Sequence, residues 1–185
     1  LMKDGEIVYR KGYGSRNMEE SLPSTPDTLY GIGSCTKSYI CFAVMKQVEA
    51  GKITVGTPIR DYLPVEVGYA DSPITVGSLM SHSSGFPSLG AADVLIAKMS
   101  LGGHPLPLTS TEDFYSFLNH AQDRLDSKPD EKYYYLNSGY TLLGLLLEKL
   151  TGTSLEEHLK KLIWKPLGMK RTTFLKKSSR STRRG

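Results

Sequence analysis

A serine and a lysine that together can perform acyl transfer stand three residues apart in the segment Ser34-Cys35-Thr36-Lys37. Residues at this spacing are neighbours on one face of a helix. A serine becomes a strong nucleophile when a base takes its proton, and a lysine with a lowered pKa can be that base. Free N–H groups at a helix N-terminus also favour the negative charge that develops in acyl transfer. The segment predicts a nucleophilic serine paired with a lysine.

A phenol and an amide form a second candidate cluster at Tyr135 and Asn137. They stand directly before a long apolar segment, where a loop can present both side chains to a cleft. The first cluster is preceded by Gly31 and Gly33, which open a turn before the expected helix. The order of the two clusters therefore supports one composite site.

The apolar spacing predicts helices that carry both clusters. One begins at Ser34 and stops at Gly51, and another runs from Ser138 to Gly152 with apolar residues on nearly every face. Shorter helices are expected after the capping residues Thr75, Ser110 or Thr111, and Ser154.

Strands are expected at both ends of the chain. Asp4-Gly5 predicts a hairpin turn before a strand over residues 6–11, and residues 28–32 and 172–175 also resemble strands. We expect the terminal strands to share one sheet, with a helical insertion between them, which is an α+β class. A long loop is expected from Ser83 to Pro107.

The composition is that of an ordinary globular protein, with 39% hydrophobic and 23% charged residues. Seven of the 23 basic residues lie in the last sixteen positions, and removing them leaves 16 against 19 acidic residues. The net charge of +4 therefore reflects a basic terminus, and we expect no nucleic-acid partner.

Several other classes of protein have no support in the sequence. No apolar run approaches the roughly 18 residues of a membrane span. The four histidines lack metal-ligand spacing, so no metal and no cofactor are expected. Cys35 and Cys41 are six residues apart on one expected helix, about 9 Å along its axis, so they cannot form a disulfide with each other.

Longer segments resemble the serine β-lactamase-like and penicillin-binding protein family, which includes class C β-lactamases, D-aminopeptidases and esterases. The similar segments, in the order of the family, are "GIGSCTKSY", "EAGKITVGTPIRDYLP", "ITVGSLMSHSSGFP", "YYYLNSGYTLLGLLLEKLTGTSLEEHL" and "IWKPLGMKRTTF". The resemblance implies a β-lactamase/transpeptidase-like fold, in which an antiparallel sheet has flanking helices and a helical subdomain.

The resemblance also implies roles for four residues. Ser34 is the acylated nucleophile, Lys37 its proton acceptor or electrostatic partner, Tyr135 a second acid/base group, and Asn137 the residue that holds the substrate amide. A small-molecule or peptide substrate is implied, whether β-lactam, D-amino-acid peptide or ester. The compartment stays open.

The chain departs from the family at two residues and lacks two of the family's segments. Asp130 stands where relatives often have Gly, and Leu136 where Ser is common, which affects loop shape and the cleft wall. The family's third motif, a KTG-like or HxG-like triad on a strand, has no match after Phe174, and the N-terminal helix is also absent. The chain also opens with Leu1 and lacks the apolar core of a signal peptide.

These departures define the expected extent of the domain. We expect residues 1–175 to form part of a β-lactamase-like domain, about the first half to two thirds of a member, and residues 176–185 a basic disordered tail. We also expect self-association, or docking with the missing C-terminal portion.

Other interpretations compete with this one. Ser34 is also a good helix N-cap. "GIGSCTKS" resembles a phosphate-binding loop, but Thr36 stands where that loop needs Gly. The same fold can serve as a non-catalytic binding protein or scaffold. For His82 we expect a structural role in holding a loop.

Overall fold

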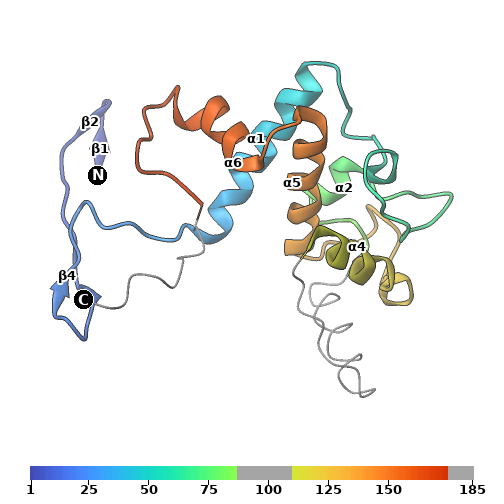
Figure 1. Ribbon diagram of the computed structural model, residues 1–185, viewed down its shortest axis with the longest axis horizontal. Coiled ribbons are helices and arrows are strands. Elements are labelled where there is room, and N and C mark those ends of the chain that lie inside the picture. Colours follow the sequence, from blue (N-terminus) through green and yellow to red (C-terminus); the bar gives the residue numbers. More distant parts are fainter. Residues whose placement is uncertain (87–109, 175–185) are drawn as a thin grey trace. The chain divides into compact units, whose positions relative to one another are not determined.

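A computed structural model describes residues 1–86 and 110–174 of the 185-residue chain. The chain divides into two compact units, Leu1–Ser34 and Cys35–Gly185 (Figure 1). Most of the long loop expected between Ser83 and Pro107, and the whole expected tail 176–185, lie outside the described residues.

The N-terminal unit consists of two small antiparallel hairpins. Strand β1 (Met2–Lys3) pairs with β2 (Glu6–Ile7), and β3 (Ser15–Asn17) pairs with β4 (Leu22–Pro23). Asp4 and Gly5 both have positive φ, as a tight hairpin turn requires. The first hairpin is therefore confirmed, with a strand shorter than expected.

Two strand predictions are wrong. Residues 28–32 form no strand; Thr28 N–H instead donates to Thr25 O in a local turn. Residues 172–174 form none either, and Thr173 Oγ1 donates to Glu156 Oε1 while the Phe174 ring packs near that of Trp164. The described strands form two separate two-stranded sheets, so the expected pairing of N-terminal and C-terminal strands is absent from the described chain.

The second unit is helical and holds the apolar core. Helix α5 (Asn137–Thr151) contacts α1 (Thr36–Glu49), α2 (Val76–Met80) and α6 (Leu155–Leu159), as Figure 1 shows. Four leucines of α5 have no exposed surface: Leu142, Leu143, Leu146 and Leu147. Because three helices pack around α5, an apolar sequence on nearly every side of this helix is expected.

Short helices and local caps complete the unit. A 3-10 turn η1 (Gly33–Cys35) precedes α1, and α4 (Thr111–Asn119) begins shortly after the second described range starts at residue 110. Two further 3-10 turns are η2 (Ile59–Asp61) and η3 (Gln122–Arg124), and α6 continues into a π-helix η4 (Lys160–Trp164).

The expected capping residues are confirmed. The hydroxyl of each accepts a hydrogen bond from the N–H three residues later, at Thr75, Ser110 and Ser154. Because such bonds satisfy N–H groups that a helix leaves unpaired, they fix where α2, α4 and α6 begin.

Candidate active site

Lys37 lies in the first turn of α1 and reaches the first residue of α5. Its Nζ donates a hydrogen bond to Asn137 Oδ1 at 2.7 Å, across 100 residues of sequence. The packing of α1 against α5 brings the two side chains together. The lysine of the first cluster and the amide of the second therefore belong to one site.

Two tyrosine rings surround the same ammonium group. Lys37 Nζ is 4.7 Å from the ring centroid of Tyr135 and 5.3 Å from that of Tyr140. An aromatic face attracts a cation at such distances. Tyr135 thus meets Lys37 through its ring, at the end of the loop that leads into α5.

Tyr140 is a site residue that the sequence analysis missed. Its hydroxyl donates to Met80 O at 2.9 Å and lies 3.1 Å from Cys41 Sγ. Burial, followed by the contact with Cys41, raises the pKa of Tyr140. A tyrosine on an otherwise apolar helix face was the available signal, because a buried phenol needs a polar partner.

The loop that carries Tyr135 is held by His82. His82 Nδ1 accepts a hydrogen bond from Leu136 N–H at 3.0 Å, and its carbonyl accepts one from Tyr134 N–H at 2.8 Å. The expectation that His82 holds a loop is confirmed. Burial lowers the pKa of His82, and the charge of Lys37 lowers it further.

Asp130 and Leu136 are the two residues at which this loop is expected to depart from the family pattern. Asp130 has φ +68°, a left-handed conformation that Gly adopts freely and Asp tolerates. Ser83 Oγ donates to its carboxylate at 2.6 Å, which supports that turn. Leu136 is buried in the core with 4% exposure, so its assignment to the cleft wall is wrong.

Ser34 is the last residue of the N-terminal unit and lies in the turn η1, where its neighbour Gly33 has φ +50°. The α-helix itself begins two residues later, at Thr36, so Ser34 is not its first residue as expected. The structure therefore brings together three of the four predicted site residues within the second unit: Lys37, Tyr135 and Asn137. Ser34, at the end of the first unit, stands three residues before Lys37 in the sequence.

Three further observations concern the described residues. Both cysteines are free thiols, as expected. Across residues 1–86 and 110–174, no group of three or more potential ligands could hold a metal ion. In the same ranges, no helix has the length and apolar character to cross a membrane.

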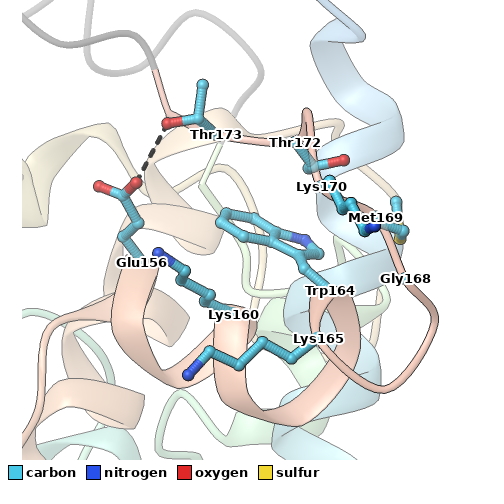
Figure 2. Close-up of a pocket in the computed structure, with 9 residues that line it drawn as sticks. All are labelled: Glu156, Lys160, Trp164, Lys165, Gly168, Met169, Lys170, Thr172 and Thr173. Carbon is cyan, nitrogen blue, oxygen red and sulfur yellow. Dashed lines mark hydrogen bonds between the residues drawn. The ribbon is translucent and has the colours of Figure 1, made fainter.

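A separate pocket of about 570 Å³ lies at the end of the described chain (Figure 2). Its lining residues come from α6, η4 and the segment after them: Glu156, Lys160, Trp164, Lys165, Gly168, Met169, Lys170, Thr172 and Thr173. None of the four predicted site residues lines it. This pocket is therefore distinct from the cluster around Lys37.

Comparison with known proteins defines the family. The sequence profile described as "Beta-lactamase" matches residues 1–184, so the chain belongs to the β-lactamase family. Its fold is of the β-lactamase/transpeptidase type.

Three similar proteins illustrate the match. An Escherichia coli K12 protein whose name refers to a D-alanyl-D-alanine carboxypeptidase is 31% identical over 94% of this chain and 42% of its own length. The octameric penicillin-binding protein homologue of Pyrococcus abyssi is 45% identical, with a TM-score of 0.81 over 94% of this chain and 39% of that one. A penicillin-binding protein of Bacillus halodurans is 25% identical, with a TM-score of 0.74 over 96% of this chain and 53% of that one.

The chain thus spans about two fifths of the length of the first two relatives. This share is smaller than the half to two thirds expected from the motifs, whereas the 53% of the Bacillus halodurans protein lies within that range.

Proposed function

We propose that the protein is a serine hydrolase that works through an acyl-enzyme on an amide, peptide or ester. Ser34 is the nucleophile and Lys37 its proton acceptor or electrostatic partner. Tyr135 is the second acid/base group, and Asn137 holds the substrate amide. Membership of the β-lactamase family supports this assignment.

The hydrogen bond from Lys37 to Asn137, at 2.7 Å, is the observation that carries the proposal. It joins the lysine three residues after Ser34 to the amide two residues after Tyr135. A helix N-cap role for Ser34 gives no reason for these two distant groups to meet. A shared reaction gives one, because a nucleophile, a base and an orienting amide must lie together.

In the proposed reaction, Ser34 Oγ forms a bond to the substrate carbonyl carbon and its proton passes to Lys37. The carbon–nitrogen or carbon–oxygen bond of the substrate then breaks, and the leaving group takes a proton from Tyr135. In hydrolysis, a water molecule gives one proton to the deprotonated Tyr135 and its oxygen bonds to the acyl carbon. The bond from that carbon to Ser34 Oγ breaks, and Lys37 returns its proton to Ser34, so all three side chains regain their starting states.

The substrate class we propose first is a peptide or amide of a D-amino acid. Support comes from the Escherichia coli relative, whose name refers to D-alanyl-D-alanine carboxypeptidases. β-Lactams and esters are the alternatives, because all three present a carbonyl to the same nucleophile. Comparison of the three as substrates of the full-length protein ranks them directly.

Turnover of a chromogenic ester tests the proposal against a non-catalytic binding role. The full-length protein should show a burst of one equivalent followed by steady hydrolysis. Ser34→Ala should abolish both phases, whereas Ser38→Ala, which changes an exposed serine four residues further along, should leave them intact. Substrate binding without release of the chromophore would contradict hydrolysis and favour a binding protein.

We further propose that the protein associates with copies of itself. The Pyrococcus abyssi homologue, at 45% identity, is named as octameric. Light scattering during size-exclusion chromatography of the full-length protein should therefore give a mass of several subunits. A single-subunit mass across the micromolar range would overturn this part of the proposal.

A further inference from the structure

His82 connects the turn after α2 to the loop that carries the proposed acid/base residue. It is buried, with 9% exposure, and no step of the proposed reaction uses it. Its ring centroid lies 4.5 Å from that of Tyr135 and 5.1 Å from that of Tyr140. His82 therefore packs against both tyrosines that face Lys37.

The hydrogen bonds of His82 define its protonation state. Because Leu136 N–H is a donor, the Nδ1 atom that receives it at 3.0 Å must carry a lone pair. The ring is therefore neutral, with its proton on Nε2. A second bond, from Tyr134 N–H to His82 O, fastens the residue on the other side of Tyr135.

The backbone of Tyr135 is thus fixed from both flanks by one residue. These two hydrogen bonds of His82 hold the backbone directly before Asn137, whose side chain accepts a hydrogen bond from Lys37. A shift of this loop would move the Tyr135 ring and the Asn137 amide together relative to Lys37. Misplacement of a reacting group by about 1 Å can cost 10²-fold in rate.

We propose that His82 is a positioning residue of the hydrolase site, and that its neutral Nδ1 holds Tyr135 and Asn137 at their distances from Lys37. The inference rests on the proposed function and adds a residue to it. His82 itself exchanges no proton with the substrate.

The backbone at His82 determines which substitutions are informative. Its φ is +60°, a conformation that Asn adopts more readily than most residues. His82→Asn can keep both the conformation and an acceptor oxygen for Leu136 N–H. His82→Phe keeps an aromatic ring but has no acceptor. His120→Asn is the control, because the Nδ1 of His120 also bonds a backbone group, here the Ser116 carbonyl, whereas His120 is exposed and directly follows α4.

The experiment follows phosphonylation of Ser34 in the full-length protein by a fluorophosphonate, in which Ser34 Oγ bonds to phosphorus and fluoride leaves. It records the rate constant separately from the fraction that reacts. His82→Phe should lower the rate constant by about 10- to 100-fold in the molecules that react. His82→Asn should restore most of it, and His120→Asn should match the wild type. A purely structural role would lower the reacting fraction and leave the rate constant unchanged, which would overturn the inference.

A double-mutant cycle with Tyr135→Phe completes the test. If His82 acts through Tyr135, the substitution His82→Phe should lower the labelling rate constant much less in the Tyr135→Phe variant than in the wild type. Fully additive losses would contradict the proposed connection. Absence of any labelling in the wild type would instead contradict the proposed hydrolase, so the two failures are distinguishable.

Discussion

At the residue scale, the role of Lys37 depends on whether it accepts a proton or only supplies charge. Lys37→Arg separates the two, because a guanidinium keeps the charge but cannot be deprotonated in a protein. If Lys37 is the base, Lys37→Arg and Lys37→Ala should both slow acylation by about 10²- to 10⁴-fold. Near wild-type acylation by Lys37→Arg, measured by stopped-flow, would assign Lys37 an electrostatic role only.

Tyr135 offers an equally direct test, since its neighbour Tyr133 is a matched control. Tyr135→Phe removes the hydroxyl but keeps the ring that faces Lys37 at 4.7 Å. We expect acylation to slow by about 10²- to 10⁴-fold with an unchanged unfolding midpoint. Tyr133→Phe, at a position with 66% exposure, should behave as the wild type. A wild-type rate in Tyr135→Phe would remove Tyr135 from the mechanism.

At the element scale, the short helix α2 carries the chain toward His82, so its cap matters to the site. Thr75 Oγ1 accepts from Ser78 N–H at 3.1 Å, and Ser78 Oγ accepts from Thr75 N–H at 3.0 Å. Thr75→Ala should lower the free energy of unfolding by about 0.5–2 kcal/mol, measured by urea titration. Thr75→Ser keeps the acceptor oxygen, so its free energy of unfolding should fall much less. An equal fall in both variants would show that the methyl group of Thr75 matters instead of its hydroxyl.

The elements also show which parts of the fold the sequence predicts. The caps at Thr75, Ser110 and Ser154 were predictable because each involves residues within three positions of one another. The hairpin β3–β4 was missed because its turn contains no Gly or Pro. It is supported instead by Asn17 Oδ1, which accepts from Glu20 N–H, and Ser21 has positive φ.

The candidate site was predictable only in part, because local motifs identify its residues but not the contacts between distant segments. Lys37 and Asn137 were identified by motif, but their hydrogen bond spans 100 residues, so no local pattern contains it. The contribution of Tyr140 depends on three contacts from other segments, with Lys37, Cys41 and Met80. Such non-local contacts become visible only when α1, α2 and α5 are packed together.

At the scale of the whole molecule, two histidines link stability to pH. Burial is the main cause that lowers the pKa of both His82 and His158 below the ordinary value of 6.5. Below pH 6.5 the unfolded chain therefore binds more protons than the folded one, and stability falls as the pH drops toward the lowered values. Above pH 6.5 this contribution is fully present.

Thermal unfolding between pH 5 and 8 measures this effect. The midpoint should stay level above about pH 6.5 and decline below it. His82→Asn should flatten part of the decline, because Asn does not titrate. Carboxylates with lowered pKa, such as Asp71 and Asp126, contribute only near and below their ordinary value of 3.8. A midpoint that rises from pH 6.5 to 5 would contradict the assignment.

The central claim is that Ser34 forms a covalent acyl-enzyme, and peptide mapping after probe treatment tests it most directly. A fluorophosphonate or penicillin probe is added to the full-length protein, and the modified residue is located by fragmentation mass spectrometry. The neighbouring Cys35 is an exposed free thiol and is the natural competitor. We predict one added probe mass on Ser34, absent from Ser34→Ala. A probe mass on Cys35 with Ser34 unmodified would contradict the account.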